Sequence, residues 1–70
     1  MSETHTFPDD SHVLSAGYDA GSSRLTIHFP GGSYEYAGVP VEVWDGLRGA
    51  DSAGGYVHRV IKGRYKGTRT

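Results

Sequence analysis

The stretch GGSYEYAGVPVEVW, residues 31–44, contains the change from strand to helix that decides the fold. Tyr34 and Tyr36 are one residue apart, so both side chains lie on the same face if this segment is a β-strand. Pro40 follows shortly after. Because proline lacks the amide hydrogen that a first helical residue would leave unpaired, Pro40 predicts the start of a helix. A strand that ends near residue 36 and a helix that begins near residue 40 indicate an α+β architecture.

The segment RLTIHF (24–29), just upstream, alternates apolar and polar residues and predicts a strand with Ile27 and Phe29 on its core face. Two glycines between the segments predict a hairpin tip, with Phe29 opposite Tyr34 and Ile27 opposite Tyr36. A slip of one residue would turn a glutamate toward the core, so the burial pattern selects this register. The Tyr-x-Tyr spacing is therefore interpreted as a packing feature of the strand.

The remaining elements follow from similar patterns. VLSAGYD (13–19) predicts a first strand, residues 39–50 predict a helix, and Ser52 is a candidate N-cap for a last helix over residues 53–65. The expected fold is α+β: a three-stranded antiparallel sheet in the order β-β-β-α-α, with the two C-terminal helices packed on one face. Eight side chains are expected to hold it together: Ile27, Phe29, Tyr34, Tyr36, Trp44, Leu47, Val57 and Ile61.

Size and composition predict one small domain. The chain has 70 residues, 36% of them hydrophobic, and no cysteine, which excludes disulfides and thiolate metal sites. We expect a flexible polar leader over residues 1–11, the folded domain over 12–66, and a flexible tail over 67–70. No secretory signal or membrane-length apolar run is visible, so the sequence predicts a soluble, cytoplasmic protein without a membrane partner.

Charge is divided along the chain. Eight acids and only two cations precede Tyr56, whereas five cations and no acid follow it. On a helix at 100° per residue, the cations between residues 58 and 66 fall mainly opposite Val57 and Ile61. A basic face of this kind is typical either of a phosphate-binding surface or of the solvated side of an amphipathic helix.

Catalytic motifs are lacking. The four histidines, at positions 5, 12, 28 and 58, show no metal-ligand spacing such as i and i+4. The glycine pairs lack the lysine and hydroxyl of a phosphate loop, and no nucleophile motif surrounds a serine. The sequence therefore predicts a protein that is not an enzyme and has no metal or other cofactor.

An ordered set of residues resembles the KTSC domain family over about residues 12–66. The set runs Tyr18-Asp19, Leu25-x-Ile27-x-Phe29-x-x-Gly32-x-Tyr34-x-Tyr36, Val39-Pro40, Trp44, Leu47, Ala50-x-Ser52-x-Gly54-x-Tyr56, Ile61 and Tyr65. That family takes its name from the C-terminus of some bacterial lysyl-tRNA synthetases and also occurs as small stand-alone bacterial proteins. The resemblance implies an association with RNA through that attachment, and it supplies no catalytic residue.

Two binding hypotheses follow. In the preferred one, the basic face of the last helix binds RNA, either tRNA or a single strand, with cations on phosphates and an aromatic ring on a base. The residues expected in this interface are His58, Arg59, Lys62, Arg64, Tyr65 and Lys66, with Arg69 adding charge. In the alternative, an exposed sheet edge pairs with a protein partner or with a second copy in a weak homodimer, and the basic face is only solvated.

Overall fold

The central hairpin forms as predicted, but with a different register. The computed structural model describes residues 2–70 and places β3 at Arg24–Phe29 and β4 at Gly32–Tyr36. Phe29 pairs with Gly32 and Ile27 pairs with Tyr34, so the predicted pairing of Phe29 with Tyr34 is wrong by two residues. The backbone of Gly32 has φ of 149°, a conformation that a β-carbon disfavours, and this lets Gly32 begin β4 directly after a two-residue turn. Because the slip is even, every side chain keeps its predicted face.

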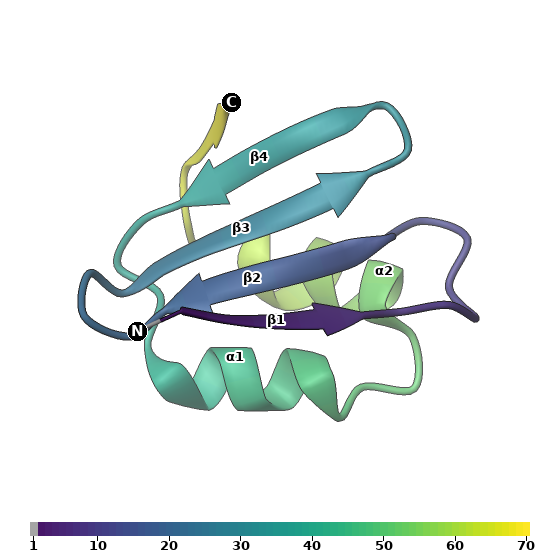
Figure 1. Ribbon diagram of the computed structural model, residues 1–70, viewed down its shortest axis with the longest axis horizontal. Coiled ribbons are helices and arrows are strands. Elements are labelled where there is room, and N and C mark those ends of the chain that lie inside the picture. The colour runs from purple at the N-terminus through teal and green to yellow at the C-terminus, as the bar shows by residue number, and fades with distance from the viewer. Residues whose placement is uncertain (1) are drawn as a thin grey trace.

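The sheet has five antiparallel strands, so the predicted three-stranded sheet is wrong. β2 spans Ser15–Asp19, and the two additional strands are β1 at Ser2–Thr6 and β5 at Gly67–Arg69. The strand order is β1-β2-β3-β4-β5, which places β1 and β5 at opposite edges (Figure 1). Both extra strands lie in the segments predicted as leader and tail. Their polar sequences gave no strand pattern, because an edge strand is held largely by backbone hydrogen bonds.

Two helical segments follow the hairpin. α1 spans Val41–Arg48 with Pro40 as its N-cap, one position before the predicted role in the first turn. α2 spans Ala53–Tyr56 and continues directly into η1, a π-helical segment at Val57–Ile61. The predicted N-cap is confirmed, since Ser52 Oγ accepts a hydrogen bond of 3.1 Å from the amide of Gly55. The helix predicted over residues 53–65 ends four residues early.

Gly46, which lowers the helix propensity of α1, has a packing reason to be there. The hydroxyl of Tyr56 donates a hydrogen bond of 3.1 Å to the carbonyl of Val43, which lies on α1 about one helical turn before Gly46. A β-carbon at position 46 would lie 2.8 Å from Cζ of Tyr56 and closer still to its hydroxyl. The glycine therefore lets Tyr56 from the second helical segment lie directly against the first.

The core lies between the helices and one face of the sheet. The α+β class and the packing of both helices on one face agree with the sequence prediction. Tyr18 stacks on Trp44 with ring centroids 5.6 Å apart, and its hydroxyl donates to the carbonyl of Val39 at 2.7 Å. The buried hydrophobic residues are Val13, Ala16, Tyr18, Leu25, Ile27, Tyr36, Val39, Trp44, Leu47, Ala53, Val57 and Ile61. Of the eight predicted core residues, Phe29 and Tyr34 are only partly buried.

Two acidic side chains attach the N-terminal region to this core. Glu3 of β1 accepts a hydrogen bond of 3.0 Å from Nε1 of Trp44. Asp10 accepts three backbone amide hydrogen bonds, two from residues 12 and 13 and one from Gly54 at the start of α2. These amides, with that of His12 the largest cause, hold the pKa of Asp10 below its usual value of 3.8. The segment before β2 is thus connected to both helical segments.

Candidate functional site

The six residues predicted for an RNA interface lie close in sequence but do not share one helix face. Because η1 ends at Ile61, only His58 and Arg59 are helical, and the other four occupy the turn before β5. Tyr65 is partly buried, and the remaining five side chains are exposed: His58, Arg59, Lys62, Arg64 and Lys66. The turn leads from η1 to the start of β5, where Gly67 pairs with Tyr36 of β4.

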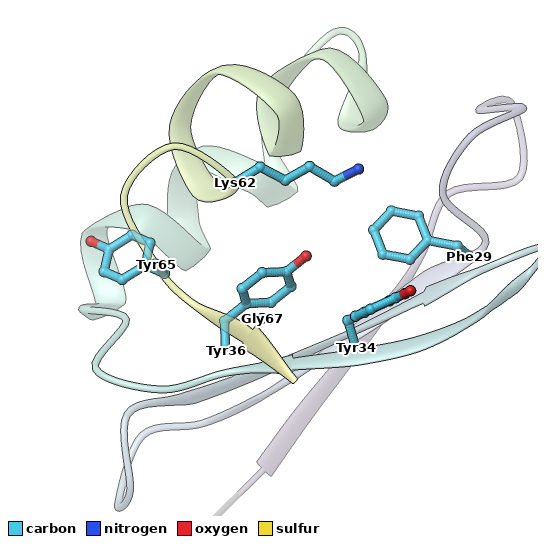
Figure 2. Close-up of a pocket in the computed structure, with 6 residues that line it drawn as sticks. All are labelled: Phe29, Tyr34, Tyr36, Lys62, Tyr65 and Gly67. Atoms are coloured by element: carbon cyan, nitrogen blue, oxygen red, sulfur yellow. The ribbon is translucent and has the colours of Figure 1, made fainter. Parts of the chain in front are cut away.

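An open hollow with aromatic walls lies beneath this turn. Its volume is about 410 Å³. Its lining, which we call the tyrosine hollow, consists of Phe29, Tyr34, Tyr36, Lys62, Tyr65 and Gly67. Figure 2 shows the stem of Lys62 extending above the hollow, with the rings of Tyr34 and Tyr36 rising from the sheet below it and Phe29 at one end. Residues from β3, β4, β5 and the turn after η1 thus enclose one space.

Lys62 is held over an aromatic ring. Its ammonium Nζ lies 5.4 Å from the centroid of Phe29, within the range of a cation–π contact. Phe29 in turn meets Tyr34 edge to face, with centroids 5.9 Å apart and ring planes at 72°. An exposed cation–π contact stabilises by only about 0.5–1 kcal/mol, so an anionic ligand can take over the ammonium group at small cost.

The position of Tyr36 depends on Gly67 of the neighbouring strand. A β-carbon at position 67 would lie 2.7 Å from Cε2 of Tyr36, so only a glycine there lets the ring lie flat across β5. Burial raises the pKa of the Tyr36 hydroxyl, and the nearby Tyr34 adds to the shift. The hydroxyl therefore stays protonated at neutral pH and can both donate and accept a hydrogen bond.

A second hollow adjoins the first on the other side of Lys62 and Phe29. Its volume is about 500 Å³, and these two residues line both spaces. We call it the histidine hollow, since it is lined by His12, Phe29, Ser52, Gly54, Gly55, Val57, His58 and Lys62. We call the two adjoining hollows together the groove, and Val57 and His58 of η1 line its second part.

Arg69 extends the positive charge along β5. It pairs with Tyr34, and its guanidinium lies 3.5 Å from where a β-carbon of Gly32 would stand. Arg69 is thus on the same face as the tyrosine hollow, at its border. Glu35, the acid between Tyr34 and Tyr36 in the sequence, points to the other face of the sheet. There its Oε1 lies 3.4 Å from Nε of Arg24.

The other histidines that could take part in binding or catalysis, His5 and His28, lie outside the groove and already contact neighbouring side chains. Nδ1 of His28 lies 2.7 Å from the hydroxyl of Ser33 on the outer face of the sheet, and His5 packs edge to face on Phe7. Among residues 2–70, no three His, Cys, Asp or Glu side chains are gathered closely enough to hold a metal ion. Over the same residues, no helix is long and apolar enough to cross a membrane.

Sequence reasoning missed the part of the hollow that comes from the sheet. Phe29, Tyr34 and Tyr36 are interpreted from the sequence as core residues because they share the core face. Only Tyr36 is buried, whereas Phe29 and Tyr34, which lie nearer the turn between β3 and β4, are partly buried. The one sequence signal that the last helix ends before residue 65 was Gly63, a residue of low helix propensity.

These features define a small α+β domain in which one antiparallel sheet carries helices on one face and an open aromatic groove beside them. The KTSC domain matches residues 9–65, and the chain belongs to this family. The predicted resemblance is thereby confirmed, and β1 and β5 lie outside the matched residues.

Relatives include a small protein and much longer enzymes. A protein of Tsukamurella paurometabola is 39% identical over 59 residues, covering 83% of this chain and 88% of that protein. A lysine–tRNA ligase of Trichormus variabilis is 40% identical over 60 residues, covering 84% of this chain but 11% of the ligase. The crystal structure of a KTSC domain protein from Yersinia pestis superposes with a TM-score of 0.91 at 31% identity, covering 100% of this chain and 99% of the other.

Proposed function

We propose that the chain is a non-enzymatic binding module that takes RNA, either tRNA or a single strand, through the tyrosine hollow and the cations around it. The observation that carries the proposal is the position of Lys62, an exposed cation set over Phe29 at the mouth of a hollow with three tyrosines. Aromatic rings beside lysine and arginine are the combination by which proteins stack unpaired bases and neutralise phosphates.

The surrounding charge supports the same ligand class. Five cations and no acid occur from Tyr56 to the C-terminus, and Arg59, Lys62, Arg64 and Lys66 are exposed. In this proposal Arg59, Lys62 and Lys66 contact phosphates, while Tyr65 lies beside a base. The occurrence of the domain in proteins named lysine–tRNA ligases agrees with an RNA ligand. The chain spans 11% of those enzymes' length, so their reaction is not carried over to it.

The test is an amide NMR titration of the full chain with single-stranded RNA and with tRNA, at low and at moderate salt. We expect salt-sensitive shifts at residues 58–66 and at the residues that line the tyrosine hollow. Replacing Lys62→Gln should reduce the slope of log affinity against log salt by about 0.7 for a single strand, since one phosphate contact is lost.

The matched control is Arg24→Gln, which removes the same charge from the opposite face of the sheet. The salt slope of this variant should equal that of the wild type. An absence of shifts with millimolar RNA at low salt would overturn the proposal, and equal slopes for the two variants would mean that binding follows net charge alone.

The alternative is a protein-interaction module that uses a sheet edge. β1 and β5 are the two edges, and all five β1 residues except His5 are exposed. Binding to a protein partner or to a second copy of the chain that survives Lys62→Gln, but is lost when Thr4→Pro disrupts the β1 edge, would favour this alternative over RNA. Size-exclusion chromatography with light scattering over a range of concentrations would detect a homodimer formed in the same way.

A further inference from the structure

The hydroxyls of the five tyrosines fall into two groups. Tyr18 donates to the carbonyl of Val39, and Tyr56 donates to the carbonyl of Val43. In the part of the chain that the structure describes, residues 2–70, the other three hydroxyls have no hydrogen-bond partner. These three all belong to the tyrosine hollow: Tyr34, Tyr36 and Tyr65.

Tyr36 is the informative member of this group. Its side chain is almost wholly buried, with a residue exposure of 3%. Its hydroxyl nevertheless points into the hollow, toward the space below Lys62 (Figure 2). Among residues 2–70 no buried side-chain nitrogen or oxygen lacks a hydrogen-bond partner, so the Tyr36 hydroxyl is accessible from the hollow and not enclosed by the core. An unpartnered hydroxyl at the base of an aromatic hollow is suited to the polar edge of a ligand.

The size and walls of the hollow restrict that ligand. Its volume of about 410 Å³ falls in the range of roughly 300–1,000 Å³ typical of small-molecule sites. The walls are aromatic rings, which favour a flat ring system, and the cation at the mouth favours an adjoining negative charge. A base inside a duplex is covered on both faces by its neighbours and cannot enter such a space.

We infer that the tyrosine hollow receives one unpaired nucleobase of a single-stranded RNA, with the Tyr36 hydroxyl on the base edge and Lys62 on the adjoining phosphate. This inference rests on the proposed function and specifies it further. The histidine hollow, which shares Lys62 and Phe29 with the tyrosine hollow, lies where the flanking nucleotide continues along η1.

The experiment uses a short uridine-rich RNA strand that carries a single 2-aminopurine, whose fluorescence falls when the base stacks on an aromatic ring. Adding the full-length protein should quench this fluorescence, and the same RNA annealed to its complement should not compete for the site. Tyr36→Phe keeps the ring and removes only the hydroxyl. We expect the dissociation constant to rise about five- to tenfold, the effect of one lost hydrogen bond.

The matched control is Tyr56→Phe, which removes a tyrosine hydroxyl that lines neither hollow and is bonded to the carbonyl of Val43. The folded variant should bind RNA like the wild type. Circular dichroism checks that both variants are folded.

Three results would overturn the inference. If RNA binds with salt-sensitive shifts at residues 58–66 but 2-aminopurine is not quenched, no base enters the hollow and the proposed function still stands. If Tyr36→Phe binds as tightly as Tyr56→Phe, the Tyr36 hydroxyl does not contact the base. If no RNA binds at all, the inference and the proposed function fail together.

Discussion

Replacing Gly46 by alanine tests how closely the two helical segments are packed. In an isolated helix this change stabilises by about 0.8–1 kcal/mol, because alanine is the better helix former. Here the new β-carbon would lie 2.8 Å from Cζ of Tyr56, so the phenol ring must move. Moving it breaks the hydrogen bond to Val43, worth about 1 kcal/mol, and overpacks the contact at a further cost of about 1–3 kcal/mol.

The cost exceeds the gain, so Gly46→Ala should lower the free energy of unfolding by roughly 1–3 kcal/mol. For a domain of this size the corresponding fall in Tm is roughly 5–20 °C. The assay is urea denaturation followed by the fluorescence of Trp44, the one tryptophan, which is fully buried. Gly49→Ala is the matched control in the C-cap of α1, since its β-carbon would meet its nearest neighbour at an ordinary 3.7 Å.

A second variant background, Tyr56→Ala, separates the gain in helix propensity from the cost of overpacking. With Tyr56→Ala the obstructing ring is gone, so adding Gly46→Ala should now raise the free energy of unfolding by about 1 kcal/mol. The reasoning is refuted if Gly46→Ala alone is as stable as the wild type, or if the sign of its effect is the same in both backgrounds.

Three further changes probe other contacts. Asp10→Asn removes a charged acceptor of three backbone amides, and the folded pKa of Asp10 lies below 3.8; its stability contribution is therefore present above pH 3.8 and lost as the pH falls through the folded pKa. Urea denaturation across this pH range should show the free energy of unfolding of the wild type falling to that of Asp10→Asn in acid. A difference in unfolding free energy that stays constant with pH would contradict the assignment. Glu3→Ala leaves Nε1 of Trp44 without its protein acceptor and should cost about 1–2 kcal/mol, measured by the shift in the denaturation midpoint; no shift would mean that β1 is not held by this bond. Gly67→Ala should displace the Tyr36 ring, lower stability by about 1–3 kcal/mol, and change the ring's NMR signals, whereas unchanged signals would show that the ring has room.

The hairpin shows what alternation in a sequence can determine. A period of two residues fixes which side chains share a face, and the face with Ile27 and Tyr36 was predicted correctly. The same period does not determine which of two adjacent glycines lies in the turn, and the register was therefore wrong by two. Gly32 begins the strand because it alone adopts the positive φ that a tight turn requires here.

The edge strands show what burial patterns cannot predict. SETHT in β1 contains no apolar residue, and its order comes from backbone pairing with β2 and from one contact, Glu3 with Trp44, across 41 residues of sequence. No local sequence pattern indicates a contact between residues so far apart in the chain. β5 is similar, since its three residues are all exposed and its position depends on where the chain turns after η1.

The charge of the candidate site and one of its aromatic residues, Tyr65, were predictable from the sequence. The cations between residues 59 and 69 are visible in the sequence, but their arrangement depends on the end of η1 at Ile61. The chain leaves the helix after Ile61, and Lys62 in the turn that follows lines one hollow together with Tyr34 and Tyr36 of β4.

The arrangement of the sheet also bears on the acidic residues, which would repel RNA if they lay near it. Glu42 is on α1, which carries Trp44 against Glu3 of β1, at the edge opposite β5. Lys62 lies over Phe29 of β3, and two strand spacings of about 4.8 Å separate β3 from β1, roughly 10 Å. That distance is longer than the screening length of about 8 Å at physiological salt.

The acids at the β1 edge should therefore have little effect on a phosphate bound at Lys62. We expect Glu42→Gln to change RNA affinity by less than about twofold at physiological salt, because its charge is screened there. Lys62→Gln should weaken binding severalfold under the same conditions, since it removes a direct contact. Fluorescence anisotropy with one labelled single-stranded RNA measures both affinities. Changes of equal size and opposite sign would mean that RNA responds to the net charge of the chain and not to the groove, and would argue against a localised site.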